Sequence, residues 1–279
     1  AKNKQGEINR LMSKEVQSQI ANECGFDIPE SIRSTDVKAF KRWSTFPCIV
    51  KPAESINGSK SDIKICHTSD ELNIAMQEFK DKEFQLQQFI DKSAEFQLIG
   101  CSLDHGEKCL IPGYTSIIRQ PDNTNTGYLL YKGMDEFLSK EFLNKAHQFL
   151  KSIGYEGLFS LEFLRDKNGK DFFMEINMRN DGNAFCVTMS GINLPNLWVR
   201  HGVNNIEAAE KAVVRPTHFM PEFDDLRVAM HKKVSVFTWL KQCIKSESHA
   251  VFFAKDPSPF FYRLFSESMR IFKKSFTAS

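Results

Sequence analysis

The sequence predicts an α+β fold, because segments with helical periodicity alternate with short apolar segments that are typical of strands. Helices are predicted at residues 7–24, 70–80 and 135–153, and again near 236–244 and 257–272. Strands are predicted at residues 46–51, 63–66, 84–90, 95–103, 108–111 and 114–119. A third observation is the dipeptide Asn168-Gly169, which favours a two-residue hairpin turn between two strand-like segments.

The composition is that of an ordinary globular protein, with 41% hydrophobic and 26% charged residues in 279. A net charge of +2 lacks the basic excess of a nucleic-acid-binding protein. Seven cysteines without a Cys-x-x-Cys pair argue against a disulfide framework or a zinc knuckle, and they fit a reducing compartment. No apolar segment reaches the length of a membrane helix. We therefore expect a cytoplasmic protein with no nucleic-acid partner and no membrane insertion.

The hairpin around Asn168-Gly169 places acidic side chains opposite one another. With that dipeptide as the loop, the predicted cross-strand pairs are Arg165 with Phe172, Phe163 with Met174, Glu162 with Glu175 and Ser160 with Asn177. Carboxylates that face each other repel, and a hard divalent cation between them would remove the repulsion. Glu162, Glu175 and Asn177 are therefore candidate magnesium ligands. The alternative is that both acids face solvent, since a one-residue slip would separate them.

A lysine at the end of an apolar strand is the second candidate site. Lys51 closes the segment FPCIVK, and a loop of small residues containing Gly58 and Ser59 follows. A lysine in this place can contact phosphate oxygens while backbone N–H groups of the loop surround them. The loop does not have the GxxxxGK[ST] pattern, and an exposed lysine at a strand end is the alternative.

The order of these elements resembles the ATP-grasp superfamily over roughly residues 10–200. The matching segments are the first helix, FPCIVKP, the small-residue loop, FQLQQFI, the long helix, SLEFL and MEINMR. Members include D-alanine–D-alanine ligase, biotin carboxylase, the carbamoyl phosphate synthetase large chain and D-aspartate ligase. The resemblance implies two α+β lobes that hold ATP between two antiparallel sheets. The expected parts are residues 1–85 (N-terminal helix and small lobe), 86–212 (large lobe with the metal site) and 213–279 (C-terminal helical extension), without the domain that usually comes first.

The resemblance also assigns roles to individual residues. The implied nucleotide-binding residues are Lys14, Lys51, Gly58, Ser59, Gln87, Gln88, Phe89, Ile90 and Glu95. Among these, both lysines match phosphate contacts, residues 87–90 match the strand beside the adenine, and Glu95 matches the ribose acid. Glu162, Glu175 and Asn177 match the metal ligands of the family. Arg179 and Lys51 are the implied catalytic residues, and Gly182 matches a loop glycine. An exposed helical lysine and an ordinary strand residue are the alternatives for Lys14 and Glu95.

The activity implied by the resemblance is ligation of a small-molecule carboxylate to an amine through an acyl phosphate. It would require ATP and Mg2+, with Mn2+ as a substitute. Arg119 is a candidate for holding the substrate carboxylate, and a surface arginine is the alternative. A carboxylase, a kinase-type transfer and a non-catalytic ATP-binding module are the rival functions. The C-terminal segment resembles tails of bacterial ATP-grasp proteins associated with cell-envelope or surface-polysaccharide synthesis, and a homodimer is left open.

Overall fold

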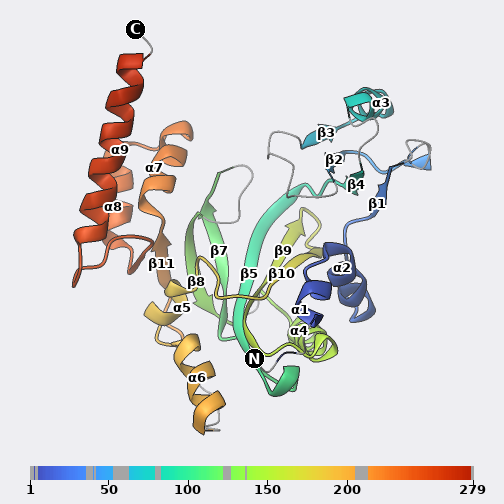
Figure 1. The fold of residues 1–279 in the computed structure, drawn as a ribbon, viewed down its shortest axis with the longest axis horizontal. Helices are drawn as coiled ribbons and strands as arrows, with labels where there is room; N and C mark the ends of the chain where they lie inside the picture. The colour runs from blue at the N-terminus through green and yellow to red at the C-terminus, as the bar shows by residue number, and fades with distance from the viewer. Residues whose placement is uncertain are drawn as a thin grey trace.

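The computed structural model describes residues 3, 6–35, 40, 42–52, 63–78, 83–121, 127–135, 137–204 and 213–277. These residues form two sheets with helices around them, which confirms the α+β class (Figure 1). The smaller sheet has the strand order β1-β4-β2-β3. The larger sheet has the order β10-β9-β5-β7-β8-β11-β12, with β6 paired to β5. Strand pairs are antiparallel except β11 with β12, which is a departure from the all-antiparallel sheets expected.

The strands of the smaller sheet are β1 (Ser31–Ser34), β2 (Cys48–Pro52), β3 (Lys64–Cys66) and β4 (Phe84–Gln88). Those of the larger sheet are β5 (Lys92–Leu103), β6 (Lys108–Leu110), β7 (Gly113–Arg119), β8 (Tyr128–Gly133), β9 (Gly157–Asp166), β10 (Asp171–Asn177), β11 (Thr217–Met220) and β12 (Ser248–His249). The helices are α1 (Glu7–Leu11), α2 (Lys14–Glu23), α3 (Ser69–Glu78), α4 (Lys140–Ile153), α5 (Phe185–Met189), α6 (Leu194–Asn204), α7 (Glu222–His231), α8 (Val236–Lys245) and α9 (Ser258–Thr277).

Two of the predicted helices have different bounds in the structure. The segment predicted as one helix over residues 7–24 is two helices, because the Ser13 side chain caps a new helix by accepting from the Val16 N–H. The helix predicted from residue 135 begins only at Lys140, where Ser139 accepts from the Phe142 N–H at 3.1 Å. None of the described helices is both long and apolar enough to cross a membrane.

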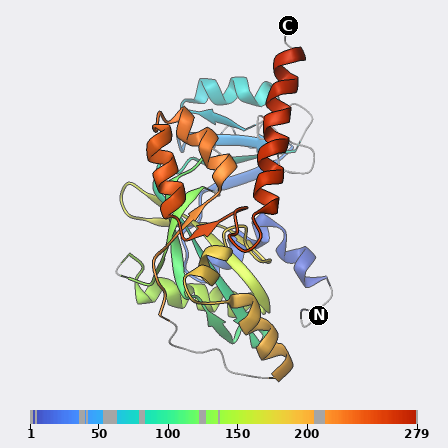
Figure 2. The same ribbon diagram turned by 90° about the vertical axis from the view of Figure 1, so that its left-hand side faces the viewer.

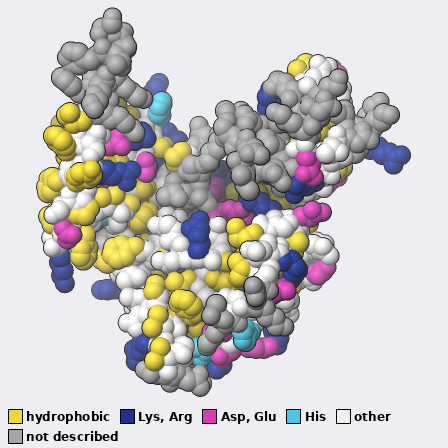
Figure 3. Space-filling view, in the orientation of Figure 1, with side chains coloured by type: hydrophobic (Ala, Val, Ile, Leu, Met, Phe, Trp, Pro, Cys, Tyr) yellow, Lys and Arg dark blue, Asp and Glu magenta, His cyan; other side chains and the backbone are white. Residues whose placement is uncertain are grey.

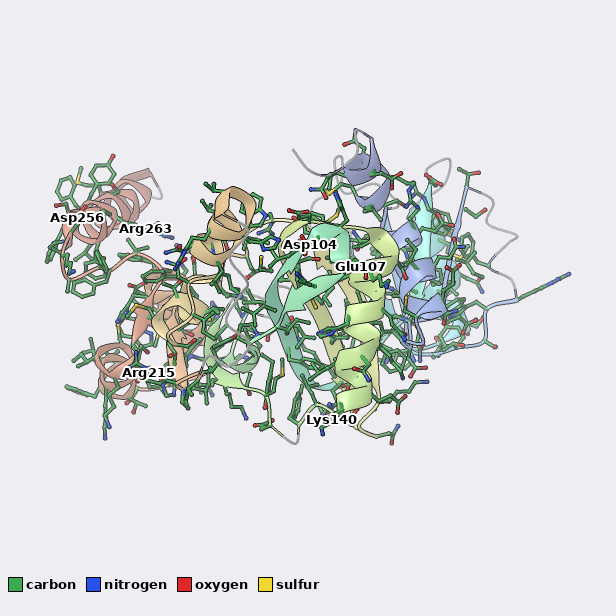
Figure 4. The ribbon with its side chains drawn as sticks, turned by 90° about the horizontal axis from the view of Figure 1, so that it is seen from below. Asp104, Glu107, Lys140, Arg215, Asp256 and Arg263 are labelled. Carbon is green, nitrogen blue, oxygen red and sulfur yellow. The ribbon has the colours of Figure 1, made fainter. Side chains whose placement is uncertain are left out.

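The larger sheet has one face covered by α2 and α4, and the main core lies between them (Figure 4). Aromatic rings dominate this core, with Phe96 stacked on Phe163 at 5.3 Å between centroids. The buried amide of Gln17 fixes α2 to β10, since its Nε2 donates to Leu11 O and its Oε1 accepts from Ile176 N. The first helices therefore pack on the larger sheet, although the predicted division grouped them with the smaller one.

The smaller sheet has a separate core closed by α3. Phe84 stacks on Phe40 at 4.5 Å, and Leu72 and Met76 of α3 are buried in the same cluster. The chain passes from β4 to β5 through only three residues, so the two sheets are directly connected. Figure 1 shows the smaller sheet and α3 above the ends of β9 and β10. This arrangement brings the carboxyl end of β2 toward the acidic residues of the larger sheet.

The β9–β10 hairpin deviates from the predicted register at two places. The loop has three residues rather than two, because Asp166 N donates to Lys170 O and Gly169 adopts φ +83°. Near the loop, Arg165 therefore faces Asp171 and Phe163 faces Phe173, and the predicted pairs with Phe172 and Met174 are wrong. A bulge between Phe173 and Glu175 then adds one residue to β10. The predicted pairs of Glu162 with Glu175 and Ser160 with Asn177 are confirmed as a result.

The region after residue 212 is joined to the larger sheet by strands as well as helices. β11 pairs with β8, and α7, α8 and α9 stand at that edge of the molecule (Figure 2). A buried ion pair holds this C-terminal extension in place: Arg119 donates to both carboxylate oxygens of Asp225, at 2.9 and 2.6 Å. Gln242 and Trp239 of α8 hydrogen-bond to the same pair. The alternative of a surface arginine is therefore wrong for Arg119, whose side chain is 6% exposed.

We predict that Arg119→Met lowers the free energy of unfolding by about 3–5 kcal/mol, because it leaves the buried Asp225 carboxylate without its cation. Urea unfolding measures the change. The control is Arg227→Met. Arg227 is more exposed than Arg119 and forms a 3.5 Å ion pair with Glu267, so its loss should cost less than about 1 kcal/mol. Equal, small losses for both variants would contradict a structural role of the buried pair.

Candidate active site

The polar side chains of the larger sheet gather on the face opposite the aromatic core. Gln97 of β5 faces Glu162 of β9, which in turn faces Glu175 of β10. Because partners across neighbouring strands project to the same side, these three side chains share one face, while Phe96 and Phe163 share the other. Figure 3 shows acidic and basic side chains between the smaller sheet and the larger one. The site therefore lies where the two sheets approach each other.

A hydrogen-bond network orients the carboxylate of Glu162. Glu162 is 8% exposed, and its Oε1 accepts from Gln97 Nε2 at 3.3 Å and from Asn177 Nδ2 at 2.5 Å. The Gln97 side chain is itself held by Asn183, whose Nδ2 donates at 2.9 Å. Ser160 donates to Asp181 at 2.8 Å beside this network. A cation between Glu162 and Asn177 would need the amide oxygen on that side, which a half-turn of the Asn177 amide provides.

Two lysines bring positive charge close to the carboxylate of Glu175. Lys14, the first residue of α2, contacts Glu175 with 2.5 Å between Nζ and Oε2. Lys51, at the end of β2, donates to Gln87 Oε1 at 2.9 Å. Burial and the nearby Lys14 ammonium lower the pKa of Lys51 to about 8, and the Glu175 carboxylate partly opposes this change. Three separate elements, α2, β2 and β10, therefore bring charged side chains into one small volume.

The structure brings together most of the residues predicted for phosphate and metal binding. These are Lys14, Lys51, Glu162, Glu175 and Asn177, with Gln87 beside Lys51. Arg179 lies at the edge of the group, with Nη2 3.5 Å from Asn177 Oδ1. Gly58 and Ser59 lie outside the described residues, and Gly182 follows Asp181 in the loop after β10. The roles assigned to these residues stay predictions, but their proximity is a feature of the fold.

The segment predicted to contact adenine lies at the junction of the two sheets. Gln88 exchanges hydrogen bonds with Glu30, donating its N–H at 2.8 Å and accepting at Oε1 at 3.3 Å. Phe89 N donates to Pro47 O at 3.0 Å, and the Ile90 side chain is buried. These contacts fix the backbone that joins β4 to β5. The adenine role of residues 87–90 stays a prediction.

Glu95 lies beside a cavity of about 260 Å³ on the polar face of the sheet. Its Oε2 accepts from Lys92 Nζ at 2.5 Å and from Gln120 Nε2 at 2.9 Å. Arg119 and Lys232 also line this cavity, so the C-terminal extension contributes to its wall. The Arg119 guanidinium is bound to Asp225, which does not favour its predicted role in holding a substrate carboxylate. The ribose role of Glu95 stays a prediction.

Several polar residues of this face are not among the site residues that the sequence predicts. Gln97 stands two residues after Glu95, and the strand period of two places both on the same side. That signal was available, whereas Asn183 and Lys232 reach the site from loops and turns whose course the sequence does not reveal. Among the described residues, no three or more His, Cys, Asp or Glu are placed to hold a metal. The predicted metal set has two carboxylates and one amide, a donor set that suits Mg2+.

No protein-family model matches the chain, and no curated protein sequence matches it. Solved structures do match. L-amino acid ligase from Bacillus licheniformis aligns with a TM-score of 0.58 and 19% identity, over 76% of this chain and 53% of that chain. N5-carboxyaminoimidazole ribonucleotide synthetase from Thermotoga maritima aligns with a TM-score of 0.56 and 16% identity, over 76% of this chain and 54% of that chain. A biotin carboxylase complex with β,γ-ATP from Campylobacter jejuni aligns with a TM-score of 0.60 and 19% identity, over 76% of this chain and 50% of that chain.

These similarities confirm the ATP-grasp fold that the sequence predicts. The chain spans about half the length of these solved structures.

We predict that Lys51→Met stabilises the protein at pH 7, by up to about 3 kcal/mol at about 1.4 kcal/mol per pKa unit. The reason is that folding lowers the Lys51 pKa from 10.5 to about 8, so the charged lysine is less stable in the folded chain than in the unfolded chain. Between about pH 8 and pH 10.5 the unfolded chain binds more protons than the folded chain. As the pH rises through this range, the wild-type protein therefore gains stability relative to the variant. Urea unfolding from pH 7 to pH 10.5 measures both effects.

The matched control is Lys167→Met, which replaces a lysine that is 69% exposed. It should leave the pH dependence of stability unchanged. A Lys51→Met protein that is less stable than the wild type at every pH would show that the Lys51 ammonium stabilises the fold, contrary to this prediction.

Proposed function

We propose that this protein is an ATP- and Mg2+-dependent ligase that joins a carboxylate to an amine through an acyl phosphate. The observation that carries the proposal is the convergence of Lys14, Lys51 and the Glu162–Glu175 pair between the two sheets. Two ammonium groups complement the charge of a triphosphate, and two facing carboxylates complement a divalent cation. Structures of the same fold support this, since one contains β,γ-ATP and another contains MgADP and bicarbonate.

The proposed division of labour follows from which groups each residue can contact. Lys51 and Lys14 would neutralise phosphate oxygens, and Lys14 would exchange its contact with Glu175 for one with the nucleotide. Glu162, Glu175 and Asn177 would hold Mg2+, which when bound supplies charge neutralisation to the phosphates. Arg179 is exposed at the edge of this group, where it would stabilise the phosphoryl group during transfer.

The reaction itself needs no covalent bond to a side chain. A carboxylate oxygen of the substrate attacks the γ-phosphorus, the bond to the bridging oxygen breaks, and ADP leaves. The amine nitrogen then attacks the carbonyl carbon of the acyl phosphate, inorganic phosphate leaves, and the nitrogen loses a proton. Positioning of the reactants and stabilisation of their negative charge would provide most of the acceleration. The network from Asn183 through Gln97 to Glu162 would supply the rigidity that such positioning requires.

The cellular setting is inferred more broadly. We infer that the protein acts in the cytoplasm, because all seven cysteines are free thiols. Small-molecule acid and amine substrates are inferred from the family resemblance. A homodimer and a role in cell-envelope or surface-polysaccharide synthesis follow only from the family resemblance. Carboxylation is the rival reaction supported by an observation, since several of the similar structures are carboxylase proteins.

We predict that the purified chain binds ATP in the presence of Mg2+ and that Lys51→Ala and Glu175→Ala each weaken binding at least about tenfold. Such a loss corresponds to about 1.4 kcal/mol, within the range for a charge-assisted contact. Isothermal titration calorimetry measures the dissociation constants. The matched controls are Lys167→Ala and Glu141→Ala, which remove one charge of each sign from side chains that are highly exposed. Binding that the site variants leave unchanged would contradict the proposed site.

The reaction type is tested by measuring ADP release with panels of acids and amines. Release that requires both an acid and an amine, with an amide as the product, supports the ligase. ADP release that requires bicarbonate, or phosphoryl transfer to a hydroxyl group, would instead assign a carboxylase or a kinase to the same site.

A further inference from the structure

Helix α8 exposes an apolar stripe on the side away from the rest of the protein. Phe237 and Ile244 are 86% and 82% exposed, and Val236 and Leu240 share their side of the helix. The inner side of α8 is occupied by Trp239, whose indole N–H donates to the buried Asp225 at 3.0 Å. The stripe is therefore not a face that the protein fold uses.

Helix α9 has the same arrangement over a greater length. Phe261, Phe265 and Met269 recur every four residues, and Tyr262 lies beside them at 75% exposure. The side of α9 that packs on α7 is instead held by a ring contact of Phe260 with Phe223 and by two ion pairs. These pairs are Arg263 with Asp224 at 3.7 Å and Arg227 with Glu267 at 3.5 Å. Figure 4 shows Arg263 on the inner side of α9 and ring-bearing side chains on its outer side.

This pattern reverses the usual amphipathic order. An ordinary surface helix buries its apolar stripe and exposes its charges. In α9, Arg263 and Glu267 contact α7 together with Phe260, while a longer stripe of apolar side chains faces outward. Exposed apolar side chains gathered in this number along two helices mark a contact with a membrane or with another protein.

The electric charge of the chain distinguishes between these two kinds of contact. Residues 232–279 contain nine Lys and Arg and three Asp and Glu, a net charge of +6, whereas the whole chain carries only +2. Lys241 and Lys245 are exposed on α8, each directly after an apolar residue of its stripe. A symmetric dimer formed through this surface would bring two strongly basic segments together, which like-charge repulsion disfavours. An anionic partner would be attracted.

We propose that the outer surface of α8 and α9 binds the surface of an anionic lipid bilayer. The rings and aliphatic side chains of the two stripes enter the boundary between headgroups and acyl chains, and the lysines contact the lipid phosphates. The chain would lie on the membrane, since none of the described helices can span one. This inference is independent of the proposed ligase activity, because no residue of either stripe lies in the candidate active site.

The test is co-sedimentation of the full chain with phosphatidylglycerol-containing vesicles and with phosphatidylcholine vesicles. We expect binding to the anionic vesicles that is at least about tenfold tighter and that weakens as salt is added. Phe261→Ser/Phe265→Ser should reduce binding at least about tenfold, since it removes two rings from the interface. Lys241→Gln/Lys245→Gln should reduce it about twenty-five-fold, at about fivefold for each lysine.

The control is Val199→Ser/Val203→Ser, which removes two exposed apolar side chains from α6 and should leave vesicle binding unchanged. Circular dichroism verifies that each variant keeps the wild-type fold. Failure of the wild-type chain to bind anionic vesicles at low salt would overturn the proposal. A dimer in sedimentation velocity that Phe261→Ser/Phe265→Ser dissociates would also overturn it, because the surface would then be an interface between two copies.

Discussion

Glu162 and Glu175 face each other on adjacent strands, and their mutual repulsion must be balanced within a site that is partly closed to water. The positive charge that offsets this repulsion comes from a residue far from both acids in the sequence. Lys14 comes from the start of α2 and contacts Glu175, so the positive charge that offsets the acid pair depends on the placement of the first helices. The Gln17 amide fixes α2 against β10, three residues from Lys14, and thereby sets where that ammonium lies.

The charges of this site are more crowded than the stability of the fold requires. Burial makes the charge of Lys51 costly, and the Lys14 ammonium beside it adds to the cost, so the pKa of Lys51 is lowered. Perturbed groups of this kind concentrate at functional sites, where a ligand completes the charge balance. A polyphosphate with a divalent cation would do so, because the phosphates would lie between the lysines while the cation would lie between the carboxylates.

The acid pair could be predicted from the sequence because two deviations of one residue cancel. The dipeptide Asn168-Gly169 indicates a two-residue loop, but the Asp166 side chain accepts from the backbone N–H groups of residues 168 and 170 and stabilises a loop one residue longer. The bulge before Glu175 then restores the register. Periodicity also located most helices and strands. It could not show that α2 packs on the larger sheet, because that depends on contacts between distant segments such as Gln17 with Ile176.

The C-terminal extension shows the same limit. Its sequence predicts two helices near the observed α8 and α9, but not which side of each faces the protein. The structure decides this through polar anchors: Asp225 binds Arg119 and Trp239, and Arg263 and Glu267 bind α7. Polar and charged groups thus provide many of these contacts, while several large apolar residues of α8 and α9 stay exposed. The candidate site and the outer surface are close in sequence, since Lys232 lines the cavity beside Glu95 and Val236 begins the apolar stripe four residues later. One short turn therefore connects the two surfaces in the chain.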